Sequence, residues 1–576
     1  MDGREVGGVR ARFALLAVLV LSSCGAHSAK KIIVIGVDGM DPGFVERHWA
    51  DLPNLKRLAF SRLATTTPPQ SPVAWSTFIT GLDPAEHGIF DFVHRDPATH
   101  ELFLSTDRTT PPRFTLPVGP YQLPLSGSHV ESLRHGAAFW VKSSLPVTIV
   151  RIPANYPPLP FGSEISGMET PDLRGTQSTF QFYTDDPGET DRAVSGGLIR
   201  KVSLTDGHLD LTIEGPPNTL RKDRAYAAVS MSLDVDAEMP AARFEVGGEV
   251  TVLRQGEWSP WLSLDFPLMP HMISARGMVR IFVKQLHPRF EIYVSPVNID
   301  PQQPALPISS PPSFAKTMGR FYTVGIPEDT SALRQGVFSL QEFLTQSREV
   351  LKDELRILDE SLRHYNNGFL FFYFSSVDQN SHILWGKYDT ELLEFYRAID
   401  SAVGDVMRRE PNAQLIVMSD HGFSTFDRAV NLNTWLLEEG LLVRDDWKNT
   451  KAYAVGLNAL YLSGADKEDV RRRLLNLRDP VNGKVVIESV TEIHATLENR
   501  RVAPDLIVGY APGYRASWAT GLGEVPDTVI DDNNDAWIAD HCINAADVPG
   551  VLFTSPGIAV NDRSLKGLSL CLRKML

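Results

Sequence analysis

Three apolar runs, each followed by an aspartate, place the strongest constraint on how this chain folds. The runs KIIVIGV, FLFFYF and QLIVM are followed, directly or within four residues, by Asp38, Asp378 and Asp420. Apolar runs of this length are typical of parallel strands that are buried on both faces of a sheet. Ligands of such sheets bind outside the carboxyl ends of the strands. We therefore expect the three aspartates to face a common site at one edge of a buried sheet.

Two segments beside these runs have the spacing of amphipathic helices. In residues 340–365 and 390–408, apolar residues recur at intervals of three and four, which is the period of one helix face. Strands that alternate with helices are typical of an α/β fold with a mainly parallel sheet. The sequence therefore predicts an α/β fold in which helices flank the central sheet.

The middle of the chain has a different pattern. Between about residues 193 and 310, segments such as 208–214 and 278–283 alternate apolar and polar residues without a helical period. This alternation predicts strands with one buried face. We expect an antiparallel β insertion that divides one catalytic domain into residues 31–190 and 311–576. The insertion is expected to govern substrate access or partner choice and to supply no metal ligand.

The length and charge of the chain exclude several functional classes. With 576 residues, of which 43% are hydrophobic, it can bury a large core and does not resemble a disordered protein. Its net charge of −14 argues against broad electrostatic binding to nucleic acid or anionic lipid. Cysteine occurs only at Cys24, Cys542 and Cys571, so no disulfide framework holds the fold. A bridge between Cys542 and Cys571 stays open, as does the oligomeric state.

The N-terminus has the pattern of an export signal. Three arginines precede an apolar run over residues 13–21, which is too short to span a bilayer as a helix. The run ends in LSSCG, which resembles the lipobox of bacterial lipoproteins and implies that Cys24 is lipidated. An ordinary secretory signal is the alternative. We expect a lipoprotein signal peptide over residues 1–23, a tether over residues 24–30, and an exported protein anchored to a membrane of a bacterial cell envelope.

Two of the three aspartates have a histidine within reach. Asp378 and His382 lie four residues apart where a strand should give way to a helix, so both side chains can face one point. Asp420 and His421 are adjacent in a turn after a strand, where neighbouring side chains can diverge toward a shared site.

The histidine His541 completes a set of nitrogen and oxygen donors that could form two metal sites of three ligands each. The candidate ligands are Asp38, Asp378, His382, Asp420, His421 and His541. Taken singly, Asp38 could be a turn residue, Asp378 a helix cap and His541 a buried histidine. The joint occurrence of acids after three strands favours the metal sites.

Ser71 begins a segment that predicts a short helix over residues 71–81. Serine suits the N-cap, Pro72 suits the first helical position, and Gly81 can end the helix. A plain helix cap is one explanation. The other is functional, because a serine oxygen at a helix N-terminus lies where backbone N–H groups and the helix dipole favour a phosphate. A metal ion could also deprotonate its hydroxyl.

Five motifs occur in the order seen in the alkaline phosphatase superfamily, at residues 36–39, 71–89, 378–382, 419–422 and 540–542. The chain most resembles the type I phosphodiesterase/nucleotide pyrophosphatase branch, and within it bacterial proteins described as predicted phosphohydrolases or phosphomutases. The resemblance covers residues 31 to about 180 and 360 to 560. It implies an alkaline-phosphatase-like sandwich with a mainly parallel central sheet.

The resemblance also implies two divalent metal ions of the zinc type. One ion would bind Asp378, His382 and His541, and the other would bind Asp38, Asp420 and His421. Manganese or iron would also suit these ligands. Ser71 falls where the family carries its threonine or serine nucleophile.

The predicted function is a metal-dependent phosphohydrolase of the cell envelope that acts on a phosphoester substrate, a diester or a monoester, through a phosphoserine intermediate. One alternative is a transferase that passes the phospho group to an envelope glycan or lipid. A second alternative is a non-catalytic binding protein whose β insertion is the functional part. The substrate and the metal in the cell stay open.

Overall fold

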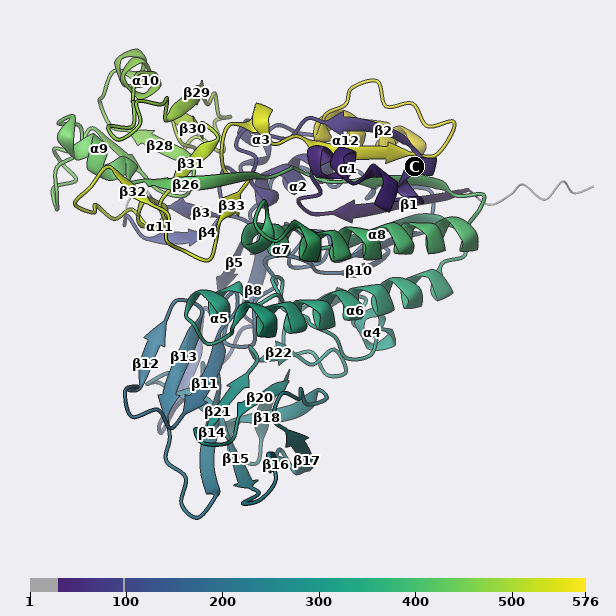
Figure 1. Ribbon diagram of the computed structural model, residues 1–576, viewed down its shortest axis with the longest axis vertical. Helices are drawn as coiled ribbons and strands as arrows, with labels where there is room; N and C mark the ends of the chain where they lie inside the picture. Colours follow the sequence, from purple (N-terminus) through teal and green to yellow (C-terminus); the bar gives the residue numbers. More distant parts are fainter. Residues whose placement is uncertain (1–29, 97–98) are drawn as a thin grey trace, which may run out of the picture.

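The computed structural model describes residues 30–96 and 99–576 of the chain (Figure 1). An eight-stranded sheet at its centre contains, in spatial order, β2 (Ala59–Leu63), β34 (Gly550–Thr554), β25 (Gln414–Met418), β1 (Lys31–Val37), β24 (Gly368–Phe374), β9 (Val147–Val150), β10 (Ser163–Ile165) and β23 (Ser309–Ser310). The strands from β25 to β10 are parallel to one another. The strands β2, β34 and β23 are antiparallel to their neighbours. The predicted α/β fold with a mainly parallel sheet is therefore confirmed.

Alternate residues of β1 face two apolar cores on opposite sides of the sheet. Ile33 belongs to one core and Ile32 to the other, and each is fully buried. Burial of such a side chain contributes about 1.5–3 kcal/mol relative to exposure. The helices that cover the two faces are α6 (Leu340–His364) and α8 (Asp389–Arg409) on the Ile33 side, and α2 (Ser71–Thr80) and α12 (Leu565–Met575) on the Ile32 side. Figure 1 shows α6 and α8 running side by side, and both agree with the predicted helices.

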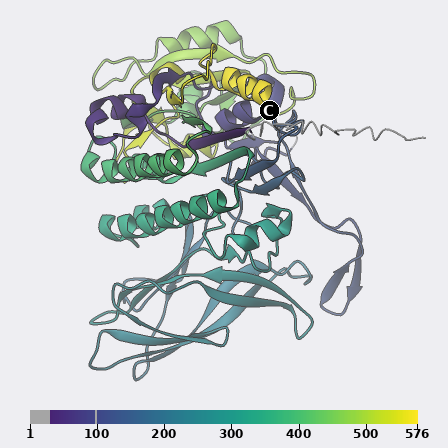
Figure 2. The ribbon, with the colours of Figure 1, turned by 90° about the vertical axis from the view of Figure 1, so that its right-hand side faces the viewer.

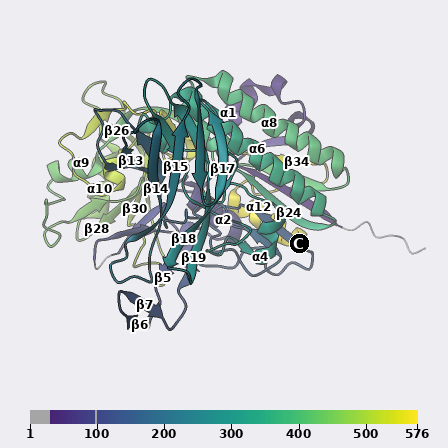
Figure 3. The ribbon, with the colours of Figure 1, turned by 90° about the horizontal axis from the view of Figure 1, so that it is seen from below.

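The middle of the chain forms three packed sheets with a core of their own, as the alternating pattern predicts. These strands make up the lower part of Figure 1 and lie toward the viewer in Figure 3. Their bounds are β11 (Phe180–Thr184), β12 (Arg192–Val194), β13 (Gly197–Lys201), β14 (His208–Pro217), β15 (Tyr226–Val235), β16 (Ala241–Val246), β17 (Glu249–Arg254), β18 (Leu262–Met269), β19 (Ile273–Val279), β20 (Ile281–Gln285), β21 (Glu291–Val294) and β22 (Asn298–Ile299). Their pairing is antiparallel except between β11 and β13.

The structure differs from the predicted pattern at two places in this region. The strand β11 precedes residue 193, yet it pairs with β13 and β21. The segment predicted as one strand over residues 278–283 is divided at Arg280, because β19 and β20 belong to different sheets. The Arg280 backbone N–H donates to Ser295 Oγ at 2.9 Å, and its side chain contacts Glu349 at 3.3 Å. Both apolar neighbours of Arg280 can therefore be buried, each in its own sheet.

A smaller lobe between β25 and β34 was not foreseen in the sequence. It has its own apolar core and occupies the upper left of Figure 1. Its elements include β26 (Ser424–Val430), β27 (Ala452–Ala454), β28 (Ala459–Leu462), β29 (Ile487–Glu492), β30 (Leu506–Tyr510), β31 (Gly513–Ala516), α11 (Trp518–Gly521), β32 (Ile530–Asp532) and β33 (Ala539–Asp540). This lobe brings β33 beside β26, and so returns the chain to the central sheet.

A hairpin arm also leaves the body of the molecule, as Figure 2 shows. It consists of β5 (Asp107–Thr110), β6 (Thr115–Val118), β7 (Tyr121–Pro124) and β8 (His129–Ser132). The backbone N–H of Gln122 donates to the Leu220 carbonyl at 2.7 Å, which ties the arm to the β insertion.

Two expectations concern cysteine and the membrane. Cys542 and Cys571 are both free, so the possible bridge between them is absent. In the part of the chain that the structure describes, no helix is long and apolar enough to cross a membrane. The predicted lipidation site at Cys24 lies outside the described residues.

Candidate metal centre and its cavity

The sheet topology brings the three aspartates together. β1 lies between β24 and β25 in parallel register, so Asp38, which follows β1, lies between the ends of its two neighbours. Asp378 is in the first turn of α7 (Ser376–Leu384), directly after β24, and Asp420 follows β25. His541 follows β33, near the C-terminal end of the chain segment that forms the smaller lobe.

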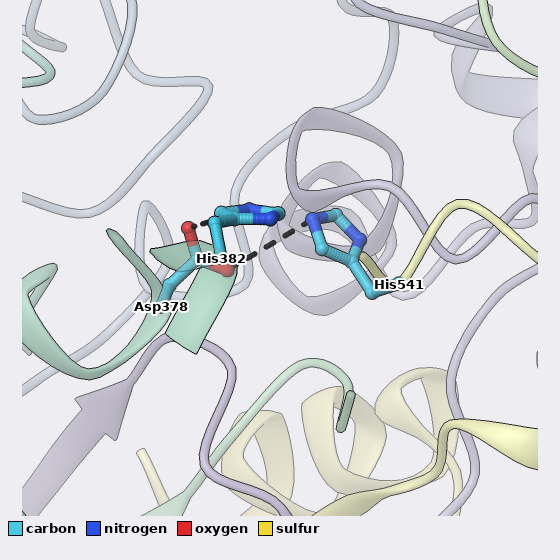
Figure 4. Close-up of side chains that lie close together, drawn as sticks. All are labelled: Asp378, His382 and His541. Atoms are coloured by element: carbon cyan, nitrogen blue, oxygen red, sulfur yellow. Dashed lines mark ion pairs between the residues drawn. The ribbon is translucent and has the colours of Figure 1, made fainter. Parts of the chain in front are cut away.

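The six candidate ligands form two groups of three. The ligand atoms of Asp378, His382 and His541 all lie within 4.8 Å of one another, and so do those of Asp38, Asp420 and His421. Asp378 Oδ2 lies 3.5 Å from His382 Nε2, and Asp378 Oδ1 lies 3.9 Å from His541 Nε2 (Figure 4). The two groups adjoin each other, because the rings of His421 and His541 stack with centroids 3.5 Å apart. This grouping is the one that the family resemblance implies.

The three histidines are oriented by backbone carbonyls. His382 Nδ1 donates to Ala539 O at 2.8 Å, and His541 Nδ1 donates to Pro69 O at 2.6 Å. His421 Nδ1 lies 3.2 Å from Gly422 O. A histidine that donates through Nδ1 presents the lone pair of Nε2, which is how metal-bound histidines are commonly held. Each Nε2 faces the carboxylates.

The carboxylates of this centre are buried, and of the three Asp38 accepts hydrogen bonds from Trp75 Nε1 at 3.0 Å and from the Tyr373 hydroxyl at 2.6 Å. Asp38, Asp378 and Asp420 are at most 2% exposed. Within the described residues, all ion pairs of these carboxylates are to histidines. Asp378 Oδ1 and Asp420 Oδ2 have no hydrogen-bond partner in the part of the chain that the structure describes. A buried carboxylate oxygen without a partner is costly. These orphaned oxygens fit divalent cations.

The pKa values of Asp420 and His421 in the second group are both raised. Burial, together with the charges of Asp38 and Asp378, raises the pKa of Asp420 well above its ordinary value. Burial alone would lower the pKa of His421, but the charges of Asp420 and Asp38 raise it to about 10. The centre therefore carries an excess of negative charge, which favours cations.

Ser71 is at the first helical position of α2 and is 1% exposed. Its Oγ lies 3.2 Å from His421 Nε2 and 3.4 Å from Asp38 Oδ1. The predicted N-cap position of this serine is wrong by one residue, because Gln70 is the N-cap. The Gln70 side chain donates to Asp91 Oδ2 at 2.7 Å, which anchors it in the extended conformation before the helix. The hydroxyl of Ser71 is thus directed to the ligands rather than to its own helix.

A buried network behind the ligands has no local sequence signal. Asp540 is 2% exposed and lies 2.8 Å from Arg515 Nε, and it accepts a hydrogen bond from Trp537 Nε1 at 2.9 Å. The Trp537 ring stacks on His382 with centroids 3.7 Å apart. Burial alone would raise the pKa of Asp540, but the charges of Arg515 and His382 lower it. Asp540 therefore stays ionised. It accepts a hydrogen bond from the His541 backbone N–H at 2.7 Å and holds the Trp537 ring against His382.

Asp540→Asn is expected to weaken metal binding at the Asp378 group by about 10–100-fold, the usual effect of losing a partner behind the ligands. Isothermal titration with zinc measures it. Asp479→Asn is the matched control, because Asp479 is equally buried and is paired with Arg428 at 2.9 Å outside the centre. Both variants should lose about 3–5 kcal/mol of stability through a broken buried pair. Equal zinc affinity in the two variants would contradict the positioning role of Asp540.

A cavity of about 590 Å³ opens onto the centre. Ser71, Asp378, His382 and His541 lie in its lining. The other walls come from segments far apart in the sequence, including Phe92, Met168, Leu457, Trp518 and Leu522. The β insertion contributes Ser195 and Gly196 from the turn between β12 and β13 and none of the six candidate ligands.

We compared the chain with protein families, curated proteins and solved structures. The chain matches the family model described as type I phosphodiesterase / nucleotide pyrophosphatase over residues 32–211 and 307–530. A search of curated proteins found no match. Among solved structures, phosphonoacetate hydrolase from Sinorhizobium meliloti with phosphonoacetate is 14% identical, with a TM-score of 0.46 and 95% of each chain covered. Murine ectonucleotide pyrophosphatase/phosphodiesterase 5 is 10% identical, with a TM-score of 0.40 and 95% of each chain covered.

Proposed function

Since the chain belongs to the type I phosphodiesterase / nucleotide pyrophosphatase family, a family of phosphoester hydrolases, we propose that it cleaves phosphoesters with Ser71 as the nucleophile. The position of the Ser71 hydroxyl carries this proposal. It lies within 3.4 Å of Asp38 and His421, and it lines the same cavity as the Asp378 group.

The two groups of ligands would each hold one divalent cation. Zinc suits donors of this type, and manganese or iron is also compatible. When bound, the cations would neutralise charge on the phosphoryl oxygens and lower the pKa of the serine hydroxyl.

The chain itself contributes the nucleophile and its orientation. Ser71 Oγ attacks the phosphorus and its proton passes to solvent water, while the bond to the leaving oxygen breaks. The leaving oxygen takes up a proton from solvent in return, and the group departs as an alcohol. Water then cleaves the phosphoserine and restores the hydroxyl. The dipole of α2 favours the phosphoryl anion at its N-terminus. Few backbone donors remain free there, because Pro72 has no N–H, and the N–H groups of Val73 and Ala74 donate to Gln70 O.

A screen of the metal-loaded protein against phosphomonoesters, phosphodiesters and phosphonates tests this function, with the chelated protein as the control. Hydrolysis predicts that free product appears in water, whereas transfer predicts that label moves to an added glycan or lipid acceptor. Failure to release or transfer any product from the whole set would refute the proposed enzyme activity.

We also propose that the protein is anchored to the cell envelope through lipid on Cys24, since the residues before it have the pattern of a lipoprotein signal. Cys24→Ser should move the protein from the membrane fraction to the soluble fraction without changing its specific activity. Immunoblots of fractionated cells measure this. A wild-type protein that is already fully soluble would contradict the anchor.

A further inference from the structure

The cavity beside Ser71 has room for much more than a phosphoryl group. Its volume of about 590 Å³ is within the range of pockets that bind drug-sized organic ligands. Ser71 and the Asp378 group line it, so a phosphoester bound at the centre would place one of its organic groups in the remaining space.

The walls of this space are largely apolar. They include Phe92, Val93, Met168, Ile326 and Leu457. Two further apolar side chains that line the cavity are exposed to solvent, with Trp518 39% exposed and Leu522 62% exposed. Burial of apolar ligand surface against such walls favours binding in proportion to the area removed from water.

The two arginines in the lining are already paired. Arg334 makes a two-pronged ion pair with Asp535, with a shortest distance of 2.6 Å. Arg515 lies 2.8 Å from Asp540, is 1% exposed, and is covered by the Trp518 ring at 4.0 Å. Arg515 Nη2 has no hydrogen-bond partner within the described residues, but the guanidinium lies under the Trp518 ring and is almost fully buried. Neither cation is therefore accessible to a second negative group of the substrate.

The other titratable groups of the walls are acids. Asp91, Glu328 and Asp329 are each at most 4% exposed and line the cavity. Their hydrogen bonds come from neutral donors, such as the Leu457 backbone N–H, the Ser376 hydroxyl and the Tyr293 hydroxyl. A carboxylate or second phosphate in the cavity would therefore lie beside these acids while both lining arginines are paired or covered, which is unfavourable in a buried site.

We infer that this site selects phosphoesters whose organic group is uncharged and apolar, either alkyl or aromatic, and disfavours substrates that carry a second anionic group. The inference rests on the proposed phosphohydrolase function, because the centre must hold the phosphoryl group. It names a substrate class that neither the ligand set nor the family defines.

Binding of phosphonates, which are not hydrolysed at an ester bond, tests the preference separately from turnover. The metal-loaded full chain is titrated calorimetrically with methyl-, propyl-, butyl-, phenyl- and 2-carboxyethylphosphonate. Affinity should rise by about four-fold for each added methylene, the effect of burying one such group. The carboxyethyl compound should bind at least about ten-fold more weakly than propylphosphonate.

Trp518→Ala supplies a second test of the same inference. Removal of this ring uncovers the Arg515 guanidinium, so the penalty against the carboxyethyl compound should shrink while affinity for the alkyl series falls. Trp447→Ala is the matched control, because Trp447 is 48% exposed, covers Arg95 at 4.2 Å and is not part of the cavity lining. The control should bind all of the phosphonates as the wild type does.

Two results would overturn the inference. One is equal affinity across the alkyl series, and the other is binding of the carboxyethyl compound as tight as that of propylphosphonate. Either result leaves the proposed function intact if phosphoesters are still cleaved. Loss of all ester cleavage would instead refute the proposed function.

Discussion

Replacing Ser71 with alanine is expected to lower kcat by at least about a thousand-fold, because it removes the hydroxyl that lies in the cavity lining within 3.4 Å of both Asp38 and His421. The metal content should be unchanged, since Ser71 is not among the six candidate ligands. Enzyme that is quenched in acid during turnover of a labelled phosphoester should carry the label on the peptide that contains Ser71. The quenched Ser71→Ala protein should carry none.

Ser76→Ala is the matched control for this experiment. Ser76 lies on the same helix, is fully buried, and its Oγ has no hydrogen-bond partner in the residues that the structure describes. The substitution has the same chemistry but lies in the core rather than in the cavity lining. Near-normal turnover by Ser71→Ala would contradict the assignment and point to water as the attacking group.

The sequence predicts those parts of the centre that follow local patterns. Asp38, Asp378 and Asp420 are predicted because they follow apolar strands, and parallel strands bring their carboxyl ends to one edge. Pro72 and Gly81 predict the helix that begins at Ser71 to within one residue. His541 differs, since its place depends on the smaller lobe returning β33 to β26. The family resemblance assigns it, whereas its local pattern alone does not.

The parts that escape prediction depend on contacts between distant segments. Arg515 and Asp540 are 25 residues apart in sequence, and no periodicity indicates that they pair. Phe92, Met168 and Leu457 lie in segments whose apolar residues would be expected in the core. That these three side chains line one cavity depends on how the distant segments pack together. The division of the predicted strand at Arg280 has the same origin, because alternation predicts a buried face but not the sheet to which that face belongs.

Removal of divalent cations is expected to abolish activity and to lower the stability of the protein. Cations bound at 1,000 times their dissociation constant stabilise the folded state by about 4 kcal/mol per site. Elemental analysis of the active protein should find about two transition-metal ions per chain, one for each ligand group. His541→Ala should reduce this content, because it removes one of three ligands from the Asp378 group. A metal-free protein with full activity would refute the metal centre.

The substitution Asp420→Asn tests whether Asp420 is a metal ligand or a carboxylate that only stabilises the fold. In the metal-free protein, Asp420 is buried beside Asp38 and Asp378, and its Oδ2 lies 3.3 Å from His421 Nε2 but has no hydrogen-bond partner in the described part of the chain. The amide is always neutral, so it removes the cost of placing an ionisable carboxyl group beside two carboxylates, and it can donate a hydrogen bond to Asp38. The metal-free variant should therefore unfold at a higher temperature than the metal-free wild type, yet gain less stability when zinc is added.

A higher melting temperature without metal, together with a smaller gain when zinc is added, is the result expected of a carboxylate that binds a cation. A carboxylate whose charge is compensated by other residues of the chain would, when replaced, lower the melting temperature both with and without zinc. Thermal unfolding with and without chelator measures the four melting temperatures. Ser424→Ala is a suitable control, since Ser424 follows Asp420 and His421 closely in sequence, and within the described residues its hydroxyl donates to the Thr425 carbonyl at 3.2 Å rather than to a candidate ligand. It should leave both the order of the melting temperatures and the gain with zinc unchanged. If metal-free Asp420→Asn melted below metal-free wild type, the charge of Asp420 would be compensated within the chain, and the assignment of this group to a cation would be wrong.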